Sequence, residues 1–266
     1  MVRKYLKSKF KIGLLVSIFV LSSLPCISFA EPKKDDVTSK SAIIAPKNQN
    51  KSKTKIVYID DVKYYLSKAD EYKKKNPKAL DNDVNTYIKK VVEEHEKTSN
   101  RNIDQKELNS TATSIEATTQ AIYTINPLEQ ALLDENPVKG YQCISFGNDA
   151  IVQSQQWYES YVLVDHNGDA FRHCYWNALM VRGTGFDWAQ RWADAHENGA
   201  TDQTELAKRM DFSNNSVGRY YGQYFSYRLD IDLLCRQAVR NGECWRINNG
   251  SSGLEATDSY GEKAGT

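Results

Sequence analysis

Helix start and stop signals delimit the apolar segments between Asn126 and Arg240, and they constrain the fold more than any other feature of the sequence. Asn126 stands before Pro127, a pair typical of a helix start because the Asn side chain caps free backbone N–H groups and proline fits the first turn. Gly183 and Gly199 stand where two later helices would end. The predicted helices are 126–136, 169–182, 187–197, 201–210, 213–228 and 231–240. We therefore predict an all-α helical bundle.

Composition divides the chain into a lysine-rich N-terminal part and an aromatic C-terminal part. All five Trp residues of the 266-residue chain lie beyond position 150, where enough apolar surface gathers for a core. Ser, Asn and Lys dominate the stretch that follows the first thirty residues. The predicted organisation is a signal peptide (1–30), a disordered linker (31–55), a helical N-terminal segment (56–117), a helical core domain (118–248) and a flexible tail (249–266).

The first thirty residues have the pattern of an export signal. A basic start is followed by an apolar run at 13–25 and by Ser28-Phe29-Ala30, the small-x-small pattern that a signal peptidase cleaves. The apolar run is shorter than the ~20 residues that a membrane span needs. We therefore expect a secreted protein, extracellular or associated with the cell envelope. It would begin at Glu31 and keep no stable membrane span after cleavage.

Two amphipathic helices are predicted between the linker and the core. Apolar residues recur at helical spacing over 59–74 and 81–97, and Asn76-Pro77 separates the two stretches. These helices could be a propeptide, a spacer that carries the domain away from a cell envelope, or an appendage packed on the core.

Export favours disulfide bonds, because compartments outside the cytosol are oxidising. Four cysteines remain in the mature chain: Cys143, Cys174, Cys235 and Cys244. Sequence alone allows three connectivities. We favour Cys235 with Cys244, because Asn241-Gly242 can turn the chain back between them, which leaves Cys143 with Cys174. Four free thiols packed as small hydrophobic side chains are the alternative.

Ionisable residues gather on the predicted helix 169–182, which is otherwise apolar on most sides and is therefore expected in the middle of the bundle. Asp169 and His173 fall on one face, because residues four apart are neighbours on a helix. The next helix carries His196 in line with two Trp residues, and Glu197 follows it. If that helix returns antiparallel, its polar residues can face His173 across the bundle.

Three kinds of chemistry suit these residues. A divalent metal ion could be bound by two histidines and a carboxylate, with an open position for a water molecule of lowered pKa. A His–Asp dyad could instead activate water as a general base. The third is a buried polar network that fixes helix register. The candidate catalytic residues are Asp169, His173, His196, Glu197 and Asp211, and the candidate metal ligands are His173, His196 and Asp211, with Asp169 or Glu197 as alternative carboxylates. Structural or substrate-positioning roles are assigned to Arg172, Asn214, Asn215 and Arg219.

Several other kinds of site lack support in the sequence. The stretch from Asp165 to Asp169 resembles the start of a calcium loop, but Trp176 occupies the twelfth position, where a bidentate Glu is needed. The chain has no Gly-rich phosphate loop, no nucleophile elbow and no basic strip interleaved with aromatic residues. Nucleotide and nucleic-acid binding are therefore not expected.

Four motifs occur in order along the predicted core. They are Asn126-Pro-Leu-Glu129, Asp169-Ala-Phe-Arg-His-Cys-Tyr-Trp176, Ala195-His-Glu197 and Met210-Asp-Phe-Ser-Asn-Asn-Ser-Val-Gly-Arg219. Together they resemble an uncharacterised helical domain of secreted bacterial proteins. The resemblance covers the chain from Asn126 to about Gly222, and it implies a helical fold without implying an activity. By position, it implies a shared site at Arg172, His173, His196, Glu197, Asp211, Asn214, Asn215 and Arg219.

The hypothesis from sequence is a secreted all-α protein with a polar site inside its core. The favoured activity is that of a metal-assisted hydrolase, with a divalent metal as cofactor, acting on envelope or extracellular material. The alternative is a non-catalytic extracellular binding or interaction domain in which the polar cluster is structural. Either way, the expected partner is an extracellular or envelope component.

Overall fold

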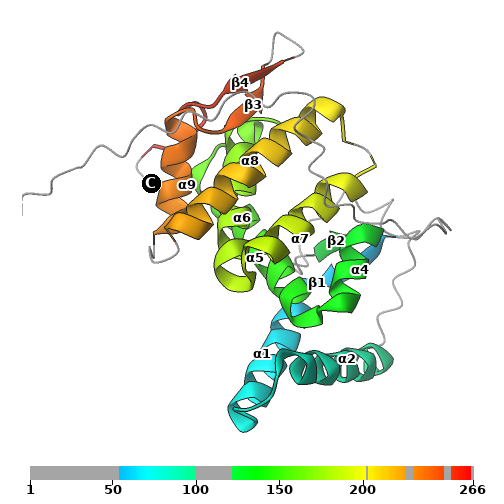
Figure 1. Ribbon diagram of the computed structural model, residues 1–266. Helices are drawn as coiled ribbons and strands as arrows, with labels where there is room; N and C mark the ends of the chain where they lie inside the picture. Colours follow the sequence, from blue (N-terminus) through cyan, green and yellow to red (C-terminus); the bar gives the residue numbers. More distant parts are fainter. Residues whose placement is uncertain (1–53, 100–121, 202, 226–229, 249–252, 265–266) are drawn as a thin grey trace, which may run out of the picture.

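Eight α-helices and two small antiparallel sheets make up the described part of the chain, so the prediction of an all-α fold is confirmed (Figure 1). The computed structural model describes residues 54–99, 122–201, 203–225, 230–248 and 253–264. The helices are α1 (Ile59–Lys75), α2 (Asp81–Thr98), α4 (Pro127–Glu135), α5 (Pro137–Trp157), α6 (Asn167–Thr184), α7 (Phe186–Gly199), α8 (Glu205–Tyr224) and α9 (Ile231–Arg240), with a 3-10 helix η1 (Ser160–Val162). The strands are β1 (Lys55–Tyr58), β2 (Ile122–Ile125), β3 (Trp245–Ile247) and β4 (Leu254–Ala256).

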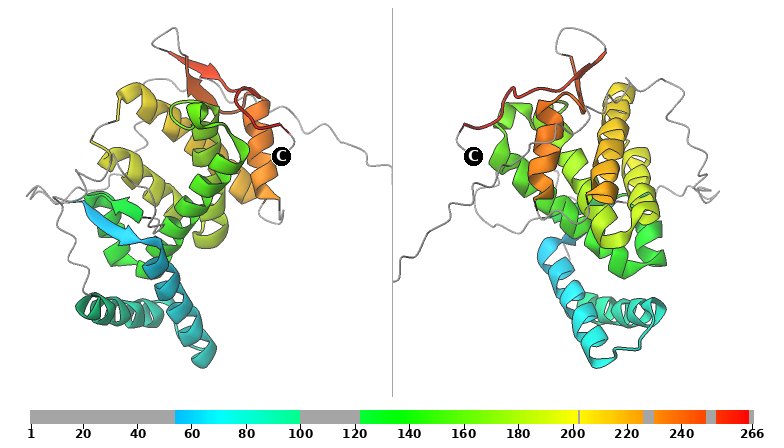
Figure 2. Two further views of the ribbon diagram at one scale, coloured as in Figure 1. Left: turned by 180° about the vertical axis from the view of Figure 1, so that it is seen from behind. Right: turned by 60° about the vertical axis from the view of Figure 1, so that its left-hand side comes forward.

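Helix α6 lies in the middle of the bundle, with α5, α7, α8 and α9 packed around it (Figure 2). Its residues Phe171, Cys174 and Ala178 have no exposed surface. Helix α8 packs closely against α6 at Gly218, where a Cβ atom would overlap the carbonyl oxygen of Cys174. The predicted central position of the 169–182 helix is confirmed, and the absence of a side chain at Gly218 permits its closest approach to α8.

The N-terminal segment is joined to the core. Helices α1 and α2 pack against each other and against α5, and strand β1 pairs antiparallel with β2, with Val57 opposite Tyr123. Val62 and Ile88 are fully buried in the same apolar cluster as Trp192 of α7. Of the three alternatives for the two amphipathic helices, the described structure corresponds to an appendage packed on the core.

Helix α5 is the described α-helix that sequence patterns missed. We expected Pro137 to end a helix, but it begins a helix of 21 residues. Asn136 caps this helix, because its side-chain oxygen accepts a hydrogen bond from the backbone N–H of Lys139 at 3.1 Å. The pair of Asn followed by Pro therefore acts as a helix start twice within twelve residues.

Helix α8 is continuous, although separate helices at 201–210 and 213–228 were predicted. It begins after Thr204, whose hydroxyl accepts a hydrogen bond from the backbone N–H of Ala207 at 3.1 Å. The hydroxyl of Ser213 donates to the carbonyl oxygen of Arg209 at 2.8 Å, so this polar residue is accommodated inside the helix. The expected break near Ser213 is therefore absent from the described helix.

The predicted flexible tail is packed on the bundle over its described residues, 253–264. Strand β4 pairs antiparallel with β3. The carboxylate of Glu262, with only 7% of its side chain exposed, accepts hydrogen bonds from Arg236 and from Nε of Arg240 on α9, the latter at 2.5 Å. The sequence alone did not reveal this packing, because the arginine partners of Glu262 lie more than twenty residues away.

The predicted disulfide bonds are wrong for this structure, in which all four cysteines are free and buried. Cys143 packs in the apolar cluster formed with α1, α2 and α7, whereas Cys174 belongs to a second cluster formed with α8 and α9. The turn at Gly242 does form, with a backbone φ of 75°. The turn brings Cys235 and Cys244 into the same apolar cluster, where both lie beside Cys174. All three are free thiols.

The predicted signal peptide (1–30) lies outside the described residues, as does the predicted linker (31–55) except for its last two positions. None of the helices in the described ranges is long and apolar enough to cross a membrane.

The contact between α6 and α8 predicts a large effect of a small substitution. Gly218→Ala places a methyl group against backbone atoms of α6 that cannot move aside independently. We expect this overpacking to lower the free energy of unfolding by about 1–3 kcal/mol, measured by urea denaturation. Ser216→Ala, at an exposed position of the same helix, is the matched control and should change stability little. Equal stability of both variants would contradict the close packing.

Candidate functional site

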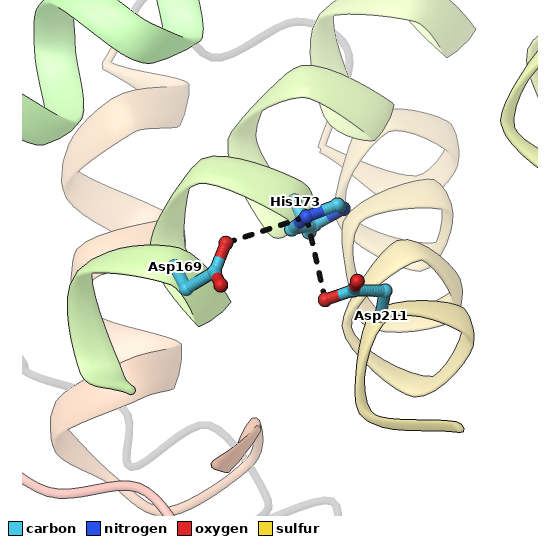
Figure 3. Close-up of side chains that lie close together, drawn as sticks. All are labelled: Asp169, His173 and Asp211. Carbon is cyan, nitrogen blue, oxygen red and sulfur yellow. Dashed lines mark ion pairs between the residues drawn. The ribbon is translucent and has the colours of Figure 1, made fainter. Parts of the chain in front are cut away.

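Two carboxylates and one imidazole meet between α6 and α8 (Figure 3). Nε2 of His173 lies 3.4 Å from Oδ1 of Asp169, one turn earlier on α6, and 3.3 Å from Oδ1 of Asp211 on α8. One ligand atom from each residue lies within 4.8 Å of the other two. The three residues are only 3–4% exposed. We call this group the Asp/His cluster.

The first turn of α6 and the loop before it hold Asp169 in place. The backbone N–H of Asp165 donates to Oδ2 of Asp169 at 2.6 Å, and Asp165 has a positive φ of 58°, a conformation that Asp tolerates better than most residues. Arg172, three residues later, donates to Oδ1 of Asp169. The Arg172 side chain is 32% exposed, and its Nη2 also lies 3.3 Å from Nε2 of His173. Both oxygens of Asp169 are thereby oriented.

The other ring nitrogen of His173 faces a different set of acceptors. Nδ1 lies 3.2 Å from Oδ1 of Asn215 and 3.5 Å from Oε1 of Glu197. The amide nitrogen of Asn215 donates to Glu197 at 2.9 Å, and Asn177 donates to Oδ1 of Asn215 at 2.6 Å. Because a carboxylate only accepts, the amide nitrogen of Asn215 must face Glu197, and its oxygen must face His173. Nδ1 therefore carries the hydrogen that is donated to this side.

Opposing charges set the protonation of the Asp/His cluster. Burial alone would lower the pKa of His173, but the surrounding carboxylates, above all Asp211, outweigh burial and raise it. Burial raises the pKa of Asp211, and the negative charge of Glu197 adds to the effect. Burial would also raise the pKa of Asp169, but Arg172 and His173 hold it well below its usual range. The cluster thus favours an additional positive charge at Nε2 of His173.

One oxygen of Asp211 lacks a hydrogen-bond donor. Oδ2 accepts a hydrogen bond from the side-chain amide of Gln203, whereas buried Oδ1 has no hydrogen-bond partner in the part of the chain that the structure describes. This same oxygen faces Nε2 of His173. Buried polar atoms are nearly always satisfied, so an unsatisfied one signals a missing partner such as a water molecule or an ion.

His196 does not join the Asp/His cluster, although sequence reasoning placed it among the metal ligands. Its Nδ1 lies 2.8 Å from Oε1 of Glu129 on α4 and 3.2 Å from the hydroxyl of Tyr123 on β2. The edge of Trp176 contacts its ring, with ring centres 4.9 Å apart. The two polar residues of the Ala-His-Glu motif therefore contact different groups. Glu197 lies beside Nδ1 of His173, whereas His196 pairs with a second buried carboxylate, that of Glu129.

The remaining predicted residues have structural contacts. Asn214 anchors strand β3, because its side chain donates to the carbonyl of Trp245 at 2.9 Å and accepts from the N–H of the same residue at 2.8 Å. Arg219 donates to Oδ1 of Asn177 at 3.1 Å and thereby extends the network that orients Asn215. These contacts fit the structural or positioning roles assigned from sequence.

Four residues of these networks were missed from sequence: Tyr123, Glu129, Asn177 and Gln203. The signal for Asn177 was available, since it lies one turn after His173 on the same helix face. Glu129 completes a capping box, in which its Oε2 accepts from the N–H of Asn126 at 2.9 Å. That local role concealed the second one, because nothing near Glu129 in the sequence indicates His196.

Comparison with known proteins finds a family match over part of the chain and no activity. Residues 130–243 match a domain of unknown function (DUF6973). The resemblance to an uncharacterised domain is thereby confirmed, and the matched region contains the Asp/His cluster and His196. No curated protein and no solved structure matches the chain.

The pair of Glu129 and His196 predicts a specific pH dependence of stability. Burial would lower the pKa of His196, but the hydrogen bond and charge of Glu129 outweigh it and raise the pKa. A raised histidine pKa contributes stability that is fully present below the unfolded value of about 6.5 and is lost as the pH rises through the folded value. The stability lost in Glu129→Gln should therefore be larger at pH 6 than at pH 9, measured by urea denaturation.

Glu135→Gln is the matched control for this measurement. Glu135 pairs with Arg191 at 2.5 Å on the surface, and arginine keeps its charge throughout this pH range. The effect of Glu135→Gln should therefore be the same at both pH values. A Glu129→Gln effect that is equally independent of pH would show that the charge of His196 is not coupled to Glu129.

Proposed function

We propose that this protein is an exported hydrolase that acts on envelope or extracellular material with a divalent metal ion bound by Asp169, His173 and Asp211. Three protein ligands are typical of catalytic sites, because they leave a coordination position for water or substrate. A metal ion in such a site acts as a Lewis acid and lowers the pKa of a water molecule that it binds. The proposal replaces His196 in the predicted ligand set with Asp169.

The observation that carries the proposal is that the two ring nitrogens of His173 face different groups. Nδ1 donates its hydrogen towards Asn215 and Glu197, so Nε2 is the nitrogen that faces Asp169 and Asp211. A lone pair on Nε2 would repel two carboxylate oxygens at 3.3 and 3.4 Å. Nη2 of Arg172 lies 3.3 Å from Nε2 and supplies one positive charge there, and a proton on Nε2 or a metal ion bound by all three side chains would supply a second. The proximity of the three ligand atoms supports the metal ion, because Nε2 and one oxygen from each carboxylate lie within 4.8 Å of one another.

The surrounding residues match those found behind metal-binding histidines. Such a histidine usually donates its second N–H to a carboxylate, a carbonyl or a water molecule, which fixes the ring and raises its basicity as a ligand. Asn215 and Glu197 provide these acceptors for His173. The Arg172 side chain is 32% exposed, and the guanidinium N–H groups that do not bond Asp169 can contact an anionic group of a substrate. This assigns Arg172 a substrate-positioning role.

The second candidate function is a non-catalytic binding or interaction domain with a structural polar network. The enclosure of the cluster favours it, since His173 and Asp211 are 3% and 4% exposed. In this case Nε2 of His173 carries a proton and the ionic contacts fix the register of α6 against α8. The two candidates differ in whether the cluster binds a metal ion.

Metal analysis separates the two candidates. The purified chain is loaded with Zn²⁺ or Mn²⁺, dialysed against metal-free buffer and analysed for metal content. We expect about one ion per chain in the wild type and a loss of that ion in Asp211→Asn and His173→Ala, because each removes one of three ligands. His95→Ala is the matched control: it removes a histidine that pairs with Asp61 on the N-terminal helices and should retain the ion.

Two further results decide the interpretation. Bound metal with turnover of an envelope or extracellular substrate that a chelator abolishes would support the hydrolase. No bound metal in the wild type, together with a lower melting temperature of His173→Ala, would contradict it and support the structural network. Loss of a buried hydrogen-bonded partner costs on the order of 1–3 kcal/mol.

Export supplies an independent prediction. When the full chain is expressed in a bacterium, mass spectrometry of the secreted material should find an N-terminus at Glu31, because cleavage follows Ala30. A chain that stays in the cytoplasm with residues 1–30 attached would contradict the proposed location.

A further inference from the structure

A second histidine outside the Asp/His cluster is backed by a fully buried carboxylate. Nδ1 of His196 lies 2.8 Å from Oε1 of Glu129, and Glu129 has no exposed surface. The same Oε1 accepts the hydroxyl hydrogen of Tyr123 at 2.5 Å. Because the carboxylate only accepts, Nδ1 of His196 donates to it, and the remaining proton-exchanging atom of the ring is Nε2.

The position of this carboxylate is fixed from several sides. Oε2 of Glu129 accepts from the backbone N–H of Asn126 at 2.9 Å. The side chain of Asn126 donates to the carbonyl oxygen of Ala195 at 3.1 Å, which ties the start of α4 to the end of α7 beside His196. Any side chain at Gly199 would overlap Asn126, so the two helix ends can approach this closely only with glycine there. The orientation of the imidazole is thus built into the packing.

The opposite edge of the His196 ring is accessible. The side chain is 32% exposed, and each hydrogen bond that joins its ring to other described residues uses Nδ1. A buried Nε2 without a hydrogen bond would count as an unsatisfied buried atom, and Nε2 of His196 does not. Among the described residues it therefore lies within reach of solvent. Trp176 meets the ring edge to face, with an angle of 89° between the two planes, and holds its plane.

We propose that Glu129 and His196 form a proton-transfer dyad that hydrolyses carboxylic esters, independently of the metal proposed for the Asp/His cluster. The proposal assigns proton exchange to Nε2 of His196 and a positioning role to Glu129. A buried carboxylate bound to Nδ1–H selects the tautomer of a catalytic imidazole and stabilises the imidazolium that forms during the reaction. The dyad has this arrangement, with the carboxylate behind the ring and Nε2 in front.

The surroundings of His196 favour esters over other substrates with an oxygen leaving group. The described residues that bond or stack with its ring are Tyr123, Glu129 and Trp176. Glycoside hydrolysis uses two carboxylates that flank the bond, whereas Glu129 lies behind the ring. Phosphoryl transfer relies on metal ions and cationic clamps around the phosphate, and the ring neighbours here are aromatic or acidic. Attack of water on an ester carbonyl needs a single positioned base, which the dyad supplies.

The step balances without a co-reactant. Nε2 takes a proton from water as the water oxygen bonds to the carbonyl carbon of the ester. The bond from that carbon to the alcohol oxygen then breaks, and the leaving oxygen takes the proton from Nε2. The products are a carboxylic acid and an alcohol, and His196 returns to its starting state. Glu129 remains ionised throughout and stabilises the imidazolium of His196.

Hydrolysis of p-nitrophenyl acetate by the purified full chain tests the dyad. The rate constant is measured across pH 5–9 in the presence of EDTA, so that a metal site cannot contribute. We expect His196→Ala to lower the protein-catalysed rate on the order of a hundredfold, and Glu129→Gln to lower it at least tenfold with the midpoint of the pH profile moved to lower pH. His95→Ala, which removes a histidine paired with Asp61, should change the rate less than twofold.

Two measurements keep the proposal testable if a variant fails to fold. In the wild type, diethyl pyrocarbonate should acylate His196 readily, with the modified residue identified by mass spectrometry. An NMR titration of His196 should show a pKa above the ordinary histidine value, and Tyr123→Phe, which removes one donor to Glu129, should shift that pKa. Unchanged ester hydrolysis in a folded His196→Ala variant would overturn the proposal, as would a His196 that resists acylation while His95 is modified. Loss of this activity on addition of EDTA would also overturn it, because the dyad requires no metal.

Discussion

The close contact between α6 and α8 is the constraint on which the site depends. Gly218 lets the α8 backbone approach α6 so closely that a Cβ atom would overlap a carbonyl oxygen of α6. At this spacing Asp211 reaches His173, and Asn215, one turn further along α8, reaches the opposite edge of the same ring. A wider spacing would separate both contacts. The backbone packing therefore determines the chemistry of the cluster.

Burying these charged groups is unfavourable in free energy unless each charge is compensated. Hydrogen bonds and ionic contacts from three helices compensate the charges of the cluster. Asn177 of α6 orients Asn215 of α8, and Asn215 and Glu197 of α7 together orient the His173 ring. The Nδ1 side of His173 is fully satisfied in this way. The Nε2 side faces two carboxylates and Nη2 of Arg172, and a proton or a metal ion there would add a second positive charge. The same polar residues thus orient the ring and bring three potential ligand atoms within 4.8 Å of one another.

Sequence patterns predicted the local structure well and the long-range pairings less well. Caps, glycine stops and helical spacing placed α6, α7 and α9, and the spacing of Asp169 and His173 correctly put them on one helix face. The partner of His196 could not be predicted, because Glu129 lies 67 residues away and already had a local role as a helix cap. The cysteines show the same limit: the turn at Gly242 was predicted correctly, but Cys235 and Cys244 lie beside Cys174 as free thiols without a disulfide bond.

The most direct test of the metal site is the ¹⁵N NMR spectrum of the His173 side chain before and after addition of one equivalent of Zn²⁺. The account predicts that both ring nitrogens are protonated without metal and that Zn²⁺ replaces the proton on Nε2, while Nδ1 keeps its hydrogen towards Asn215 and Glu197. Nε2 should then shift to a position typical of a metal-bound nitrogen. His173 resonances that stay unchanged with Zn²⁺ present would contradict the account and leave the cluster as a structural network.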